Sequence, residues 1–169
     1  MVATTQTARF LPFLETSEES AVLATAPTKS FETGQVVVDQ DVQMRTIFLI
    51  ETGAVRVERR EGSKMVPLAL LEAGEFFGEM SFIDGAPTSA RVIADQPTKL
   101  RLLAEATVHA LMAQDPSFAG RLYRSFAAIV AERLRLTSMH LDTLIEGIDF
   151  YSQTRAEIEA AAAKLPGMD

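Results

Sequence analysis

The sequence predicts an α+β protein in which an antiparallel β-roll of the jelly-roll type (a double-stranded β-helix) follows a short N-terminal helix and precedes a long C-terminal one. Two features indicate this fold. Between residues 31 and 103, short apolar runs alternate with glycine-containing turns and no helical pattern interrupts them, which is typical of an antiparallel sandwich or roll. After residue 103, apolar residues recur at intervals of three and four, as they do in helices.

The first nine residues are mostly small or polar, and we expect them to form a flexible N-terminus. Thr16 and Glu19 then have the spacing of a capping box, in which two side chains bind the free N–H groups at a helix start. This spacing predicts a short helix from Thr16 to about Ala26, which Pro27 ends.

Six segments of the middle region have the length and composition of β-strands. Turns that contain Gly34, Gly53, Gly62 and Gly74 separate several of them. The expected strands cover residues 36–38, 47–50, 55–57, 66–71, 91–94 and 99–103.

Two helices are expected after the strands. The first covers residues 105–114, after which Asp115 and Pro116 supply an N-cap and a first helical residue that lacks an N–H group. The second helix is long, because nothing breaks its pattern before Gly147. We expect it over residues 116–148, with a short helical tail over residues 149–169.

The long helix carries two apolar stripes. In one, the gaps alternate between four and three residues, which is the pattern of a coiled coil. The other would face the β-roll. A helix that is apolar on two sides needs two partners, so we expect a parallel homodimer; the alternative is a helix buried wholly within one monomer. The first stripe comprises Tyr123, Ala127, Val130, Leu134, Thr137, Leu141, Leu144, Ile148 and Tyr151, and the second Phe118, Leu122, Phe126, Ile129, Arg133 and Leu136.

The composition argues against several classes of protein. The formal net charge of −7 disfavours broad affinity for nucleic acids or anionic membranes. The sequence contains no cysteine, which excludes disulfides and thiolate ligands. No apolar run is long enough to span a membrane and no secretory signal is visible, so we expect a cytoplasmic protein that does not bind membranes.

The segment from residue 76 to residue 92 carries the binding chemistry. Gly78 lets the backbone approach another group closely, Glu79 supplies a carboxylate, and one apolar helical turn ends at Asp84 and Gly85. The first turn of a helix presents N–H groups that can bind an anion. A carboxylate beside such groups suits a ligand that carries hydroxyl groups as well as a phosphate.

This segment resembles the phosphate-binding cassette of the cyclic nucleotide-binding domain family. The resemblance covers residues 10–148, which we expect to form one domain, and it implies a regulatory or sensor role with cyclic AMP or cyclic GMP as the ligand. It extends beyond the cassette to Phe31-x-x-Gly34, to Ile47-Phe48-Leu49-Ile50-x-x-Gly53-x-Val55-x-Val57 and to Gly74-x-x-Phe77-Gly78-Glu79.

The resemblance also implies roles for single residues of the cassette. The backbone of Gly78 would meet the ribose and phosphate, Glu79 would accept a hydrogen bond from the ribose 2′-hydroxyl, and Ser89 would bond a phosphate oxygen. Met80 and Ser81 follow directly in the cassette and are further candidate ligand-binding residues.

A second candidate stretch lies in the long helix. Residues 133–138 are similar to a family segment in which an arginine nears the phosphate and a Thr-Ser pair meets the adenine. The resemblance therefore implies that Arg133, Thr137 and Ser138 contribute to a ligand site at the dimer interface.

One residue departs from the family pattern. Thr88 stands between Pro87 and Ser89, where the family has an arginine that binds the phosphate. Removing the charged partner of a buried anion costs about 3–5 kcal/mol, so we expect weak or absent binding of cyclic AMP. Arg91 and Arg133 could compensate, but strand alternation is expected to point Arg91 to the opposite face, which leaves Arg133 as the better candidate.

Two other classes of protein are disfavoured. A metalloenzyme of the cupin type needs two or three histidines on strands, whereas His109 and His140 both lie in helical segments; we expect no catalytic residue and no metal. Direct DNA binding is not expected either, because few residues follow Ile148 and Arg155 and Lys164 are the only basic ones among them.

Two functions remain open at this point. In the first, the chain is a stand-alone, non-enzymatic cyclic nucleotide sensor with an atypical cassette. In the second, it is a dimeric interaction module that contacts a protein effector and whose vestigial pocket binds no cyclic nucleotide.

Overall fold

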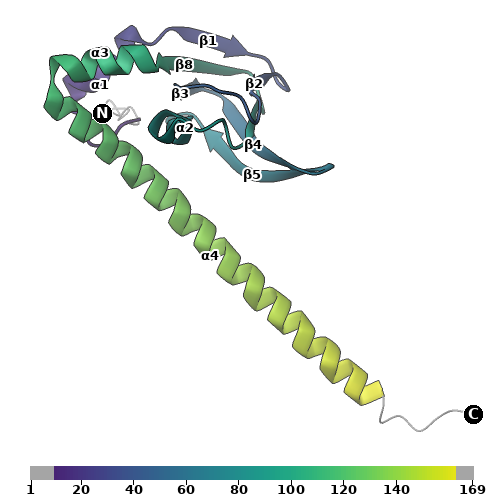
Figure 1. Ribbon diagram of the computed structural model, residues 1–169. Coiled ribbons are helices and arrows are strands. Elements are labelled where there is room, and N and C mark those ends of the chain that lie inside the picture. Colours follow the sequence, from purple (N-terminus) through teal and green to yellow (C-terminus); the bar gives the residue numbers. More distant parts are fainter. Residues whose placement is uncertain (1–9, 163–169) are drawn as a thin grey trace, which may run out of the picture. The chain divides into compact units, whose positions relative to one another are not determined.

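The computed structural model describes residues 10–162, and side chains as far as residue 139. The expected flexible N-terminus, residues 1–9, lies outside this part. The chain divides into two compact units, the first ending at Phe126 and the second beginning at Ala127. The order of the elements, shown in Figure 1, is α1 (Thr16–Thr25), β1 (Thr28–Phe31), β2 (Val36–Val38), β3 (Thr46–Thr52), β4 (Ala54–Glu61), β5 (Lys64–Glu72), β6 (Phe76–Phe77), α2 (Glu79–Asp84), β7 (Arg91–Ala94), β8 (Thr98–Ala104), α3 (Glu105–Gln114) and α4 (Pro116–Ala162).

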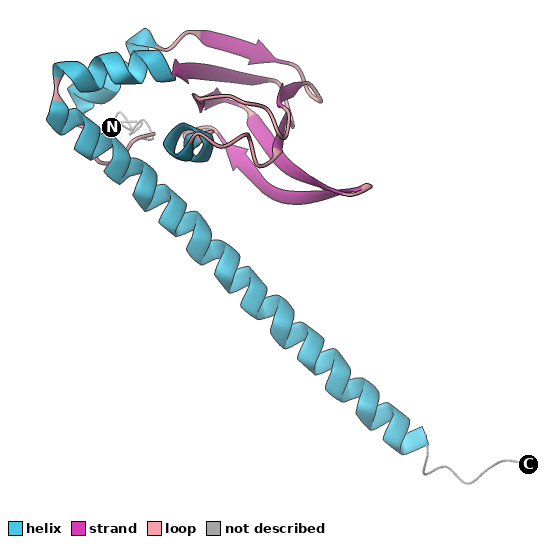
Figure 2. Ribbon diagram, in the orientation of Figure 1, coloured by secondary structure: helices cyan, strands magenta, loops and turns pink. Residues whose placement is uncertain are grey.

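The strands of the described region form two four-stranded sheets (Figure 2). The order is β1-β8-β3-β6 in the first sheet and β2-β7-β4-β5 in the second, and the paired strands are antiparallel. Most strands that follow one another in sequence are not neighbours, so the chain winds back and forth between the sheets, as in a jelly roll. The predicted fold class is confirmed.

The space between the two sheets is filled by one apolar cluster. Phe48 of β3 pairs with Phe77 of β6, and their rings stack with centroids 4.9 Å apart. Val55 and Val92 contribute to the cluster from neighbouring strands of the second sheet. The buried members are Phe31, Val38, Phe48, Ile50, Val55, Leu71, Phe77, Val92, Ala94 and Leu100.

The other face of the first sheet packs against helices. Ile47 and Leu49 alternate with Phe48 along β3 and are fully buried. Phe76 of β6 is also buried, and its ring lies 5.6 Å from that of Phe126 in α4. The centre of β3 is therefore buried on both faces, which explains why this strand is a continuous apolar run rather than an alternating one.

The six predicted strands are confirmed, most of them at greater length, whereas β1 and β6 were not predicted. β6 has only two residues, which is too short for any periodic pattern. β1 has four residues, of which only Phe31 is buried, so it lacks the apolar alternation that marks a strand in sequence.

The predicted helix over residues 16–26 is confirmed as α1, but its cap differs. Glu15, not Thr16, is the N-cap residue, and the Glu18 carboxylate accepts the N–H of Glu15 at 2.7 Å. The buried Glu19 carboxylate instead accepts the N–H of Phe10 at 2.7 Å. Glu19 thus fixes the apolar segment that precedes the helix.

The short helix over 105–114 is confirmed as α3, and Asp115 caps α4 as predicted, since its Oδ1 accepts the N–H of Ser117 at 2.9 Å. The predicted end of the long helix at residue 148 is wrong: α4 is one continuous helix from Pro116 to Ala162. Gly147 does not interrupt it, because a single glycine costs a helix only about 1 kcal/mol. Residues 163–169 of the predicted helical tail lie outside the described part of the chain.

Candidate functional site

The cassette is built on the short helix α2, which lies between two glycines. Gly78 and Gly85 both adopt left-handed backbone conformations, with φ angles of +91° and +70°. A Cβ on Gly78 would lie 2.3 Å from the carbonyl oxygen of Thr46 on β3. Gly78 therefore lies close to the backbone of β3, and the predicted contact of its backbone with a ligand stays a prediction.

The residues of α2 divide between a buried and an exposed face. Glu79 and Phe82 are buried, and the Phe82 ring lies 5.9 Å from Phe126. Met80 and Ile83 lie on the other face and are half exposed. Ser81 is buried, and its carbonyl accepts the N–H of Gly85 at the end of the helix. The candidate residues Glu79, Met80 and Ser81 thus lie on one turn, with two buried side chains and one exposed.

Thr88 is bonded entirely to the loop between β2 and β3. Its hydroxyl donates to the carbonyl of Asp39 at 2.6 Å and accepts the N–H of Val42 at 2.9 Å. Its own N–H donates to the carbonyl of Val42 at 3.0 Å, and its carbonyl accepts the N–H of Asp41 at 2.8 Å. The hydroxyl of Thr88, which stands where the family has an arginine, therefore donates one hydrogen bond to the protein backbone and accepts another from it.

A second contact joins the same loop to the cassette. Gln43 donates from Nε2 to the carbonyl of Gly85 at 2.8 Å. The Arg45 guanidinium also lies against Gly85, where an added Cβ would meet Nη2 at 2.5 Å. Arg45 is itself paired with Glu105 at 2.8 Å. The hydrogen bonds between the loop and the cassette are not visible in the sequence, because the bonded residues are more than forty positions apart.

Ser89 and Arg91 follow Thr88 at the entry to β7. Ser89 is exposed. Arg91 lies next to Val92, which belongs to the cluster between the sheets, so alternation places Arg91 on the opposite face of β7. Its Nε lies 3.7 Å from Oδ1 of Asp39. The guanidinium of Arg91 therefore has a carboxylate beside it.

Arg133, Thr137 and Ser138 belong to the second unit, whereas the cassette belongs to the first. The Thr137 hydroxyl donates to the carbonyl of Arg133 at 2.9 Å, and the Ser138 hydroxyl donates to the carbonyl of Leu134 at 3.0 Å. In both bonds the hydroxyl donates to the backbone carbonyl four residues earlier, as Ser and Thr side chains within helices commonly do. A common site for these residues and the cassette stays a prediction.

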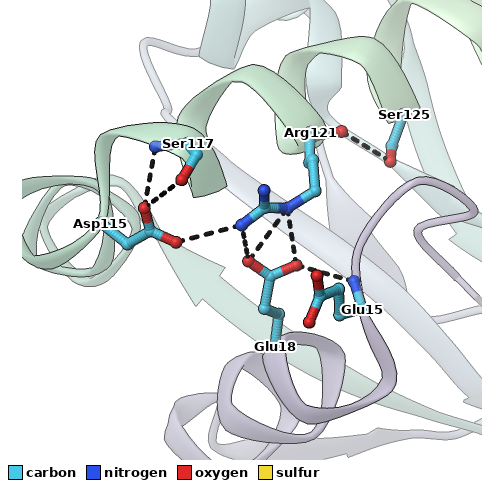
Figure 3. A network of polar contacts seen from close by, with 6 residues as sticks. All are labelled: Glu15, Glu18, Asp115, Ser117, Arg121 and Ser125. Carbon is cyan, nitrogen blue, oxygen red and sulfur yellow. Dashed lines mark hydrogen bonds and ion pairs between the residues drawn. The ribbon is translucent and has the colours of Figure 1, made fainter.

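A polar network that the sequence did not predict joins α1 to the start of α4 (Figure 3). The Arg121 side chain forms an ion pair with Glu18 and a second one with Asp115 at 3.0 Å. Hydrogen bonds from Arg121 hold the pKa of the Glu18 carboxyl below its ordinary value of 4.5. Hydrogen bonds from the hydroxyl and N–H of Ser117 likewise lower the pKa of Asp115. The network therefore ties α1 to the first turns of α4 within the first unit.

The described residues hold no group of three or more His, Asp or Glu side chains that could bind a metal ion. No helix within the described part of the chain is long and apolar enough to cross a membrane.

Comparisons with known proteins match this architecture. A family model described as "Cyclic nucleotide-binding domain" matches residues 28–115. The cyclic AMP receptor protein of Thermus thermophilus is 31% identical over 153 residues, which are 90% of this chain and 67% of that protein. Glutaminase 2 of Bradyrhizobium diazoefficiens is 31% identical over 131 residues, which are 78% of this chain and 20% of that protein.

A crystal structure of the catabolite activator protein of Thermus thermophilus superposes with a TM-score of 0.66 and 31% identity, covering 78% of this chain and 60% of that one. The chain thus spans about two thirds of the receptor protein and a fifth of the glutaminase, so the likeness concerns a shared domain. Because the segment matched by the family model contains both sheets and the cassette, this chain belongs to the cyclic nucleotide-binding domain family.

Proposed function

We propose that the chain is a non-enzymatic, homodimeric regulatory domain whose cassette binds cyclic AMP and cyclic GMP weakly. The observation that carries this proposal is the bonding of Thr88, whose hydroxyl both donates and accepts a hydrogen bond within the protein. It is therefore not a substitute for a phosphate-binding arginine. The regulatory role is supported by the similarity to a cyclic AMP receptor protein.

The charges around the cassette also support weak binding. From residue 76 to residue 90 the sequence contains Glu79 and Asp84 but no lysine or arginine. Two cations beside the cassette have carboxylate neighbours: Arg45, whose guanidinium lies against Gly85, pairs with Glu105, and Arg91 lies beside Asp39. As long as Arg45 and Arg91 stay with these carboxylates, the first unit supplies a cyclic phosphate with no cation of its own from either residue. The loss of such a counterion costs about 3–5 kcal/mol, or roughly two to three and a half decades in affinity.

Homodimer formation is supported by the apolar stripe that runs along α4. Within its described part, Tyr123 and Leu134 are exposed, although they hold seam positions of the four-three pattern. A second copy of the chain would bury them. A dimeric regulatory domain of this kind would act through a protein effector that contacts the roll or the helix.

The proposal is tested by calorimetric titration of cyclic AMP and cyclic GMP into the wild type, Thr88→Arg and Thr88→Gln. The wild type is expected to bind neither nucleotide at micromolar concentration. Thr88→Arg restores a cation and is expected to gain about 3 kcal/mol in binding free energy. Thr88→Gln is the matched control, because its side chain is long and polar but uncharged.

Micromolar or tighter binding by the wild type would contradict the proposal and direct attention to Arg133. An equal gain in Thr88→Gln and Thr88→Arg would show that removal of the threonine, not addition of a charge, opens the site. Circular dichroism of all three proteins checks that the substitutions leave the fold intact.

A further inference from the structure

We propose that Thr88 is a latch that holds the cassette in its assembled conformation through hydrogen bonds within the protein, independently of any nucleotide. This goes beyond the proposed function, because it concerns the protein before a ligand is added. The latch is the set of four hydrogen bonds between Thr88 and Asp39, Asp41 and Val42. Two of them use the hydroxyl and two use the backbone.

A hydroxyl suits this position because it can donate and accept at the same time. The carbonyl of Asp39 needs a donor, and the N–H of Val42 needs an acceptor. Valine would satisfy neither group, and arginine, which only donates, would leave the N–H of Val42 without its acceptor. Asp41 adopts a left-handed conformation with φ of +62°, which aspartate tolerates better than most residues. This turn brings the backbone groups of residues 41 and 42 to Thr88.

The far side of the loop is fixed to the second sheet. Gln40 Oε1 accepts the N–H of Arg60 on β4 at 2.7 Å. The Arg60 and Arg91 guanidinium groups lie 3.8 and 3.7 Å from Oδ1 of Asp39, on β4 and β7 respectively. The bond from Gln43 to Gly85 adds a second attachment on the cassette side. The loop therefore connects the end of the cassette to two strands of the roll.

The latch limits how far a nucleotide can change the conformation of the cassette. A ligand shifts a conformational equilibrium only by its differential affinity for the two states. Any rearrangement that separates the cassette from the β2–β3 loop must break both hydroxyl bonds of Thr88. Thr88, which takes the place of the phosphate-binding arginine, thus also stabilises one conformation of the cassette. The roll would therefore present the same surface to a partner with or without nucleotide.

Hydrogen exchange of the full chain, measured by NMR without nucleotide, tests the latch. The variant Thr88→Val lacks the hydroxyl, but its side chain keeps the size and branching of threonine. We expect the amides of Asp41, Val42 and Thr88 to exchange about tenfold faster, because two hydrogen bonds that close the loop are removed. The amides of β3 and β8 are expected to keep their wild-type rates.

Two control variants complete the test. Thr88→Ser keeps the hydroxyl and should exchange like the wild type. Thr28→Val makes the same chemical change at an exposed position of β1 and should alter no rate near the cassette. An unchanged rate at Val42 in Thr88→Val would overturn the latch. Equal acceleration throughout the roll, or Thr88→Ser behaving like Thr88→Val, would also overturn it, because either result means that the hydroxyl does not act locally.

Discussion

Gly78 lies at the start of α2 with a φ angle of +91°, in the left-handed region that favours glycine. The sequence pattern explains this glycine by the close approach of a ligand. The structure adds a second reason, since a Cβ would lie 2.3 Å from the carbonyl oxygen of Thr46. The fold therefore requires glycine here whether or not a nucleotide binds, and its presence alone is weak evidence for binding.

Gly78→Ala is expected to destabilise the protein by more than about 2 kcal/mol, because the left-handed conformation costs about 1–2 kcal/mol and the clash with a strand backbone adds to it. Gly34→Ala is the matched control: its φ of +85° is similar, but no atom lies within 4 Å of the added Cβ. Urea unfolding of both variants gives the two free energies. If they lose equal stability, the contact with Thr46 does not constrain the cassette.

Ionic and cation–π contacts join α1 and the segment before it to the start of α4. Arg121 pairs with Glu18 and Asp115 (Figure 3), and the Arg124 guanidinium lies 4.1 Å from the ring centroid of Phe13. A partly buried ion pair of this kind is expected to contribute to stability in a pH-dependent way.

The pKa of Glu18 decides whether this contribution to stability is lost at low or at high pH. Hydrogen bonds from Arg121 lower the pKa of Glu18 in the folded protein below its ordinary value of 4.5. The stabilisation is therefore fully present above that value and is lost as the pH falls through the folded pKa. Glu18→Gln should lower the melting temperature at neutral pH, and the difference from wild type should shrink below pH 4.5.

The exposed pair of Arg59 and Glu61, 3.9 Å apart, provides the control. Glu61→Gln is expected to change the melting temperature little at any pH, because exposed pairs contribute about 0–1 kcal/mol. A difference between wild type and Glu18→Gln that stays constant from neutral to acid pH would contradict the assigned role of Glu18.

The elements that could be predicted from the sequence are those with local signals. Asp115 and Pro116 marked the start of α4, and β-branched runs between glycine turns marked the longer strands. The missed features depend on contacts between distant residues. Thr88 and Asp39 are 49 positions apart, and Arg121 and Glu18 are 103 apart. No local pattern reports such pairs, so the replacement of the family's arginine was visible in the sequence but the new role of Thr88 was not.

The two apolar stripes of α4 differ within the first unit. Phe118, Leu122 and Phe126, from the stripe predicted to face the roll, are buried there, whereas Leu136, farther along the same stripe, is exposed. In the coiled-coil stripe, Tyr123 and Leu134 are exposed. The remaining stripe members from Leu141 to Tyr151 lie outside the described side chains. An apolar stripe that a single chain leaves uncovered is typical of an interface between chains.

We therefore predict that the full chain sediments as a dimer at micromolar concentration, and that replacing both Leu134 and Leu141 with glutamate yields monomers. Each buried leucine contributes about 1.5–3 kcal/mol, and a charge at a seam position adds the cost of desolvation and of repulsion between the copies. Leu136→Glu is the matched control, because Leu136 is also an exposed leucine of α4 but lies outside the four-three stripe; it should remain dimeric. A monomeric wild type, or monomers from Leu136→Glu, would show that the stripe does not form the interface. Titration of cyclic AMP into the variant with both leucines replaced then tests the homodimer and weak nucleotide binding separately. Because the two properties depend on different residues, the monomeric variant is expected to bind cyclic AMP as weakly as the wild type.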